Sequence, residues 1–161
     1  MTRGVRRLQP ASHAQTLTCS SQGGTSTKSN PNPTHQRRKL QCYGILIEHP
    51  KEGLILWETG SGKDYPTVWG APLNDIFAQV DHESDQELDK QVEKTGHKMS
   101  DIKMVILGHL HLDHAGGLEH FVGTNTPIYV HEIELKHAFF SVATGFDLGM
   151  PEISQGFFPD C

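Results

Sequence analysis

The sequence predicts an α/β (α+β) fold, with strands and helices alternating along one domain. Apolar runs of strand length, bounded by Gly and Pro, occur at residues 43–49, 54–57, 102–107 and 127–130. Segments with helical spacing and capping residues lie at about 85–95 and 132–142. A chain of 161 residues has room for one domain of the usual ~100–150 residues.

Residues 1–33 differ in composition from the rest, and we expect a disordered or transit-like segment there. This stretch is rich in Ser, Thr, Gln, Asn and Gly, and no apolar run in it is long enough to pack. The apolar core of a secretory signal is absent, whereas the basic, acid-free start also fits an organelle transit peptide. We therefore expect a cytoplasmic protein, with an organelle as the minor alternative, and a domain at residues 34–161.

Charge is unevenly distributed. Residues 1–40 hold seven Lys or Arg and no acid, so residues 41–161 hold seven basic against nineteen acidic groups, a formal −12. Such a body lacks the concentrated basic surface that binds nucleic acid. No apolar run approaches the ~20 residues that cross a bilayer. The predicted partner is a small molecule, not nucleic acid or a membrane.

The cysteines Cys19, Cys42 and Cys161 are odd in number, widely spaced and without a C-x-x-C pair. They predict neither a disulfide framework nor a zinc ribbon. Cys42 lies in the predicted strand around Tyr43–Glu48. We expect its side chain to be a buried small apolar group, not a catalytic thiol.

The first strands form a predicted hairpin: Tyr43–His49, a turn at Pro50–Gly53, then Leu54–Gly60. The second strand is apolar at nearly every position before Glu58, which is typical of a strand covered on both faces. An irregular loop at Tyr65–Asn74 follows, and we consider it as a lining for a pocket.

A helix is predicted next at about 85–95, because acids and caps open it and Gly96 closes it. Ile102–Leu107 then predicts a buried strand ending at Gly108, with a further helix from about Ala115. After the short strand Pro127–Val130, helical spacing resumes. In that last helix, apolar residues lie partly on one face, namely Ile133, Leu135, Ala138, Phe139 and Phe140.

Three histidines and an aspartate directly follow the buried strand: His109, His111, Asp113 and His114. A loop leaving a strand can aim His109 and His111 at one point, and Asp113 and His114 at a second point nearby. Imidazole nitrogen and carboxylate oxygen are normal zinc ligands, at about 2.0–2.2 Å. The spacing predicts two adjacent metals, which lower the pKa of bound water to about 7, with Asp113 also orienting the nucleophile.

A solvated His-rich loop or an adventitious metal tract is the alternative to a metal site. It fits less well, because the motif follows a strand and precedes Gly116-Gly117, where the backbone can pass close by without Cβ clashes. The other histidines of this region are expected at the surface or core edge and not as ligands, namely His82, His97, His120, His131 and His137.

With Ala115-Gly116-Gly117 behind it, this motif resembles the H-x-H-x-D-H signature of the metallo-β-lactamase superfamily. Leu56–Gly60 resembles the strand and Asp-Thr-Gly turn of that family, with Glu58 in place of the Asp; we expect Glu58 to brace the histidine loop. The similarity covers roughly residues 28–150. It is strongest to the lactonase branch, in fungal members similar to N-acyl homoserine lactone lactonases, some of which open γ-lactams.

The resemblance implies the N-terminal half of an αββα sandwich, with a mixed sheet and outer helices. It also implies a zinc-dependent hydrolase that opens a lactone or γ-lactam by a metal-bound hydroxide. Two Zn²⁺ ions would be held by His109, His111, Asp113 and His114, with Asp113 as the catalytic residue.

The family adds a third histidine, a bridging aspartate and a last histidine, for which we find no candidates after His137. We therefore expect a chain truncated after the first motif. One alternative is a weak or inactive fragment of a hydrolase. A second is an enzyme completed by a homodimer or another polypeptide, and a third is a non-catalytic metal-binding or interaction remnant.

Overall fold

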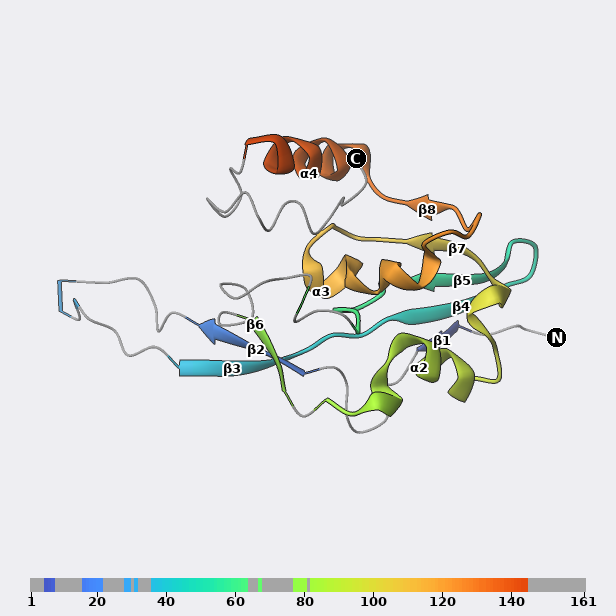
Figure 1. The fold of residues 1–161 in the computed structure, drawn as a ribbon, viewed down its shortest axis with the longest axis horizontal. Coiled ribbons are helices and arrows are strands. Elements are labelled where there is room, and N and C mark those ends of the chain that lie inside the picture. Colours follow the sequence, from blue (N-terminus) through green and yellow to red (C-terminus); the bar gives the residue numbers. More distant parts are fainter. Residues whose placement is uncertain are drawn as a thin grey trace.

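The computed structural model describes residues 5–7, 16–21, 28–29, 31, 36–63, 67, 77–80 and 82–144. Their strands form a five-stranded and a three-stranded sheet, with helices beside the larger one (Figure 1). The larger sheet has the order β1-β4-β5-β7-β8 and is mixed, since its first two pairings are antiparallel and its last two parallel. The predicted α/β (α+β) class is confirmed.

The strands of the larger sheet are β1 (Val5–Arg7), β4 (Ile45–His49), β5 (Gly53–Trp57), β7 (Ile102–Ile106) and β8 (Ile128–Tyr129). Those of the smaller sheet are β2 (Thr16–Ser21), β3 (Gln36–Gln41) and β6 (Phe77–Val80), in the order β3-β2-β6. The α-helices are α2 (Leu88–Lys94), α3 (Leu112–Ala115) and α4 (Glu132–Thr144). The 3₁₀ helices are η1 (Ser84–Gln86), η2 (Met99–Asp101) and η3 (Gly116–Phe121).

The predicted hairpin is confirmed. β4 and β5 pair antiparallel, from Ile45 opposite Trp57 to His49 opposite Gly53. Gly53 has φ +82°, a conformation that glycine adopts without a Cβ penalty. In the turn, His49 Nδ1 accepts the backbone N–H of Glu52 at 3.0 Å.

The hydrophobic core lies where α2, α3 and η3 pack on one face of the larger sheet (Figure 1). This placement follows from the two parallel pairings, β5 with β7 and β7 with β8. Each pairing needs a crossover connection, and right-handed crossovers in the same direction along the sheet put their helices on the same face. The strands, the helices and the loop at residues 107–111 (the metal loop) contribute the core residues Leu46, Leu54, Leu56, Leu88, Val92, Ile102, Val105, Leu107, Leu110, Ala115 and Phe121.

The helix predicted at 85–95 is divided in two. Ser84–Gln86 is a 3₁₀ turn in which the Gln86 side chain accepts the Glu83 backbone N–H at 2.7 Å. Glu87 has ψ 146°, so the α-helix restarts at Leu88. The next predicted helix begins at Leu112, three residues before the predicted Ala115, and so Asp113 and His114 lie in its first turn.

The helix predicted after residue 131 is confirmed as α4, but of its predicted apolar face only Ala138 lies inward. Ile133, Leu135, Phe139 and Phe140 are exposed, whereas Glu134 and Ala138, four residues apart, lie half-buried. α4 lies beyond β8 at the edge of the larger sheet (Figure 1), and most of its described side chains are exposed.

Two strands fall inside the segment predicted to be disordered or transit-like. β1 pairs with β4 and β2 pairs with β3, two pairings that the composition of this segment does not predict. The disordered or transit-like segment at residues 1–33 stays a prediction. Pairing with strands elsewhere in the sequence cannot be inferred from the composition of these residues. The predicted boundary at residue 34 stays a prediction.

The loop predicted at Tyr65–Asn74 lies outside the described residues, apart from Thr67. Within the described part of the chain, none of the helices has the length and apolar character needed to span a bilayer.

Candidate metal centre

The histidine motif begins in the short loop between β7 and α3, with His109 and His111, and continues into α3 with Asp113 and His114. Leu107 N–H donates to Tyr129 O at 2.9 Å, which continues the pairing toward β8. Leu110 is only 7% exposed and anchors the loop in the core. Its neighbours in sequence, His109 and His111, are half-buried and exposed respectively, so the loop presents both rings beside a fixed apolar anchor.

Three of the four predicted ligands come together. One donor atom each from His109, His111 and Asp113 lies within 4.8 Å of the other two. Donors bound to one tetrahedral zinc at about 2.0–2.2 Å are separated by about 3.3 Å, so a small inward adjustment would bring these atoms into range. Two imidazoles and a carboxylate are also the donor types that zinc prefers, and the residues therefore fit a divalent metal.

His114, the fourth predicted ligand, lies beside this group. Its ring centroid is 3.9 Å from that of His109, and its Nε2 is 3.4 Å from Asp113 Oδ2. Its other nitrogen, Nδ1, donates to Glu58 Oε2 at 3.0 Å. A hydrogen bond at Nδ1 fixes the ring and leaves Nε2, next to Asp113, as the atom that can bind a metal.

Glu58 braces the loop, as expected. Its carboxylate is 4% exposed, and each of its oxygens accepts one hydrogen bond: Oε2 from His114, and Oε1 from the Gly108 backbone N–H at 2.9 Å. Glu58 has φ +65°, which is uncommon for a residue other than glycine. The hydrogen bonds to His114 and Gly108 help to hold this strained backbone next to the predicted metal ligands.

A second connection holds α3 against the segment that follows Glu58. Thr59 donates to His114 O from its backbone N–H at 2.9 Å and from its hydroxyl at 2.7 Å. Gly117 N–H donates to Gly60 O at 3.2 Å. A Cβ at Gly117 would lie 2.3 Å from Thr59 O, which confirms that glycine is needed for this close approach.

The ionisation of the group follows from its packing. Burial lowers the pKa of His109, and the nearby His114 and His111 lower it further. Burial favours the neutral form of Asp113, but the hydrogen bond with His114 and its charge outweigh burial and lower the Asp113 pKa. Hydrogen bonds to Asp113 and then Glu58 raise the pKa of His114 to about 9.

Without metal, the stability of the chain is expected to fall as pH rises from 6.5 to 9. The folded-state pKa of His114 is raised from 6.5 to about 9, so its stabilising contribution is complete below 6.5 and lost as pH rises through 9. The measurement is the urea midpoint of chelator-treated protein against pH. His114→Gln should lose this slope, and an equal slope in that variant would contradict the assignment.

Cys42 lies in the link between β3 and β4, before β4 begins at Ile45, so the prediction that it is part of this strand is wrong. Its residue surface is half-buried. Burial, followed by the negative charge of Asp113, raises the pKa of its thiol to about 12. The thiol is therefore protonated at neutral pH, as expected for a structural cysteine and not for a nucleophile.

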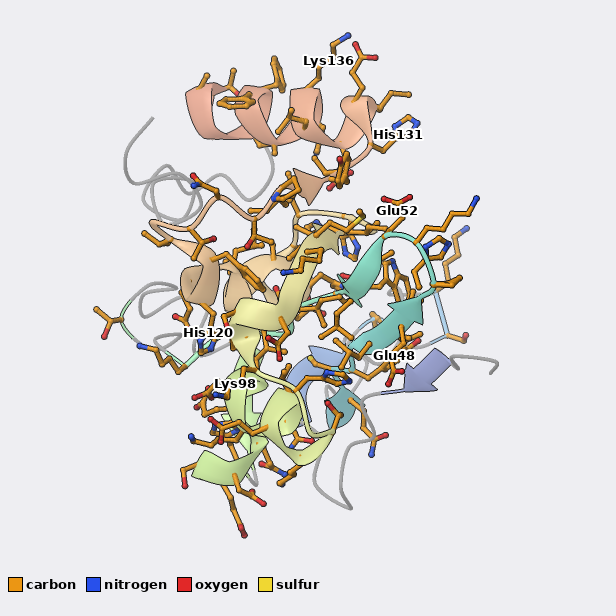
Figure 2. All side chains as sticks on the ribbon, turned by 90° about the vertical axis from the view of Figure 1, so that its right-hand side faces the viewer. Glu48, Glu52, Lys98, His120, His131 and Lys136 are labelled. Carbon is orange, nitrogen blue, oxygen red and sulfur yellow. The ribbon has the colours of Figure 1, made fainter. Side chains whose placement is uncertain are left out.

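The other histidines in the described part of the chain are not members of the group formed by His109, His111 and Asp113. His131 is exposed, and its Nδ1 accepts the Ile133 N–H at 3.2 Å at the start of α4. His120, on η3, lies 3.8 Å from Glu119 Oε1; Figure 2 shows the two histidines on separate parts of the molecule. His82 contacts Glu87 at 2.9 Å, and His97 contacts Glu48 at 3.3 Å.

One residue that contacts the loop was not predicted. Glu134, on α4, accepts the backbone N–H of Leu110 at 2.9 Å. The sequence offers no signal for it, because an acid in the first turn of a helix is common for electrostatic reasons alone.

The comparisons with known proteins agree with this geometry. The family model of the metallo-beta-lactamase superfamily matches residues 37–153. No curated protein matches the chain.

Several solved structures share the fold. AiiA of B. thuringiensis, solved as a mutant with N-decanoyl-L-homoserine at its active site, is 24% identical with a TM-score of 0.61, covering 84% of this chain and 50% of that one. An N-acyl homoserine lactone hydrolase, with the product N-hexanoyl-L-homoserine at its catalytic metal center, gives the same four values. A quorum-quenching N-acyl homoserine lactone lactonase is 26% identical with a TM-score of 0.53, covering 78% and 49%. The chain spans about half the length of these proteins.

Proposed function

The chain belongs to the metallo-β-lactamase superfamily, and from this premise we propose that it supplies the metal-binding part of a zinc-dependent hydrolase that opens a lactone or γ-lactam. The observation that carries the proposal is the convergence of His109, His111 and Asp113 within 4.8 Å at the end of β7. The neighbouring His114, fixed by Glu58, supplies a fourth donor.

The four side chains have separate roles in this proposal. His109 and His111 bind a divalent cation through imidazole nitrogen, and Asp113 and His114 bind a second cation. The lowered pKa of His109 keeps its ring neutral near neutral pH, as a ligand must be. His114 must lose a proton first, because its pKa of about 9 leaves it charged at pH 7 in the absence of metal.

Asp113 is the proposed catalytic residue. Its lowered pKa keeps the carboxylate ionised, so it accepts a hydrogen bond from the attacking water and orients it toward the acyl carbon. When bound, a divalent cation supplies Lewis acidity and makes water a stronger nucleophile near neutral pH. Water adds across the acyl C–O or C–N bond of the ring, which yields a hydroxy acid or an amino acid.

The substrate class is inferred from the structural relatives, whose names concern N-acyl homoserine lactones. Cyclic esters and amides share an acyl carbon within a small ring, so one site can be tested on both. The proposal for this chain is therefore a small neutral cyclic ester or amide, without a choice of side chain.

The test uses the whole chain purified without chelator. Metal content per chain is measured by elemental analysis. On the same sample, γ-lactone opening is followed by pH-stat titration of the acid released, and γ-lactam opening by the primary amine that is formed. We expect bound zinc and ring opening that chelation abolishes and zinc restores. Metal without turnover would instead support a non-catalytic metal-binding protein. If the chain holds no metal and opens neither ring, the proposal is overturned.

A further inference from the structure

The metal loop receives a hydrogen bond from a part of the chain that the family motif does not include. Glu134 Oε1 accepts the backbone N–H of Leu110 at 2.9 Å, across 24 residues of sequence. Leu110 lies between the two histidines that close on the metal group, His109 and His111. Any shift of this amide would therefore move both rings.

The burial pattern of α4 points to the same contact. Most described side chains of the helix are exposed, including large apolar ones such as Phe139 and Phe140. The opposite row is turned inward: Ala138 packs against the core cluster, and Glu134 lies one turn before it. Figure 2 shows Lys136 pointing away from the domain, on the outer side of the helix. A carboxylate thus occupies an inward position while apolar neighbours face solvent.

The loop itself needs such an acceptor. Residues 108–111 have no regular secondary structure that would satisfy their amides. Two carboxylates from different elements do so, one on each side of His109: Glu58 accepts the Gly108 N–H and Glu134 accepts the Leu110 N–H, both at 2.9 Å. Hydrogen bonds to an ionised acceptor are stronger than neutral ones, so both stabilise one loop conformation.

We propose that Glu134 is a positioning residue, which holds the Leu110 amide so that His109 and His111 face one metal. The inference rests on the proposed function for the metal, but not on the identity of any substrate. It differs from a general stabilising effect of an acid near a helix N-terminus, because that effect needs the charge and not the contact with Leu110.

The test compares three variants of the full chain by Co²⁺ titration, followed through the visible absorption of the bound ion. Glu134→Ala removes the acceptor and should weaken Co²⁺ binding about 10–100-fold, the usual loss when a group that orients metal ligands is removed. Glu134→Gln keeps an oxygen that can accept the Leu110 N–H and should recover most of the affinity. Glu132→Ala is the matched control, because Glu132 is exposed and its contact is with Lys136.

Hydrogen exchange of the Leu110 amide in metal-free protein provides a second readout. Protection should fall in Glu134→Ala and persist in Glu134→Gln and Glu132→Ala. Unchanged protection and Co²⁺ affinity in Glu134→Ala would overturn the inference, as would an equal loss of affinity in Glu132→Ala. If the unmodified chain binds no Co²⁺, the metal proposal fails, and the role of Glu134 toward the metal fails with it. A chain that binds Co²⁺ normally but opens no lactone leaves the inference standing and overturns only the hydrolase proposal.

Discussion

The double substitution His109→Ala with Asp113→Ala is expected to abolish metal binding and any ring opening that depends on it, while the secondary structure is retained. The two residues supply two of the three donors that lie within 4.8 Å of one another. Losing a group that merely hydrogen-bonds a ligand costs about 10–100-fold in metal affinity, so losing two ligands should cost more than about 100-fold. Both side chains are half-buried, and alanine is tolerated in loops and helices alike.

The measurement combines zinc content, lactone opening and far-ultraviolet circular dichroism on the same preparation. A matched control is His137→Ala with Asp89→Ala, which removes the same two residue types away from the group and should retain both metal and activity. Retained lactone opening in the first variant would contradict the metal assignment. A lost dichroism spectrum would instead mean that the residues are needed for folding.

A large loss of stability is expected from Gly117→Ala. A Cβ there would lie 2.3 Å from Thr59 O and 3.0 Å from Thr59 Cβ, distances that force backbone to move. Overpacking of this kind costs about 1–3 kcal/mol, and we expect the upper end because the clash is with a carbonyl and not with a flexible side chain. The displaced Thr59 also donates twice to His114 O, so metal affinity should fall as well.

The free energy of unfolding from urea titration is the relevant quantity. Gly96→Ala is the control, since its Cβ would meet nothing within 4 Å but its φ of +86° disfavours alanine. That backbone effect alone should cost about 1 kcal/mol. The contact between η3 and Thr59 would be unimportant if Gly117→Ala were no less stable than Gly96→Ala.

The parts of the fold that were predictable are those with strong local signals. The β4–β5 hairpin and β7 were evident because apolar runs were bounded by Gly and Pro, and each run forms a strand. Three residues of β5 are buried, whereas β4 has only Leu46 buried and β7 has Ile102 and Val105. The division of the helix near Glu87 was not predictable, because acids and caps fit a 3₁₀ turn and an α-helix equally well. β1 and β2 were missed because their order depends on pairing with strands distant in sequence.

The same distinction applies to the metal centre. His109, His111 and Asp113 stand close together in the sequence, and their spacing after a strand indicated a shared point. The brace by Glu58 was expected only through a family resemblance, and its strained φ was not foreseen. Glu134 was missed because the inward face of α4 is set by where the helix docks, and its apolar pattern points to the other side.

The sequence positions of these groups affect how much a metal can stabilise the folded chain. The proposed ligands lie within six consecutive residues, whereas the carboxylates that hold the loop are 50 and 24 residues away from the amides that they accept. In the unfolded chain the proposed ligands therefore stay near one another, but the contacts of Glu58 and Glu134 that orient them are lost. Because binding to the unfolded state subtracts from ligand-induced stabilisation, zinc should raise the thermal midpoint less than its affinity for the native protein suggests. The increase in the thermal midpoint that zinc still produces would measure how much the orientation of the ligands by Glu58 and Glu134 strengthens binding to the folded chain.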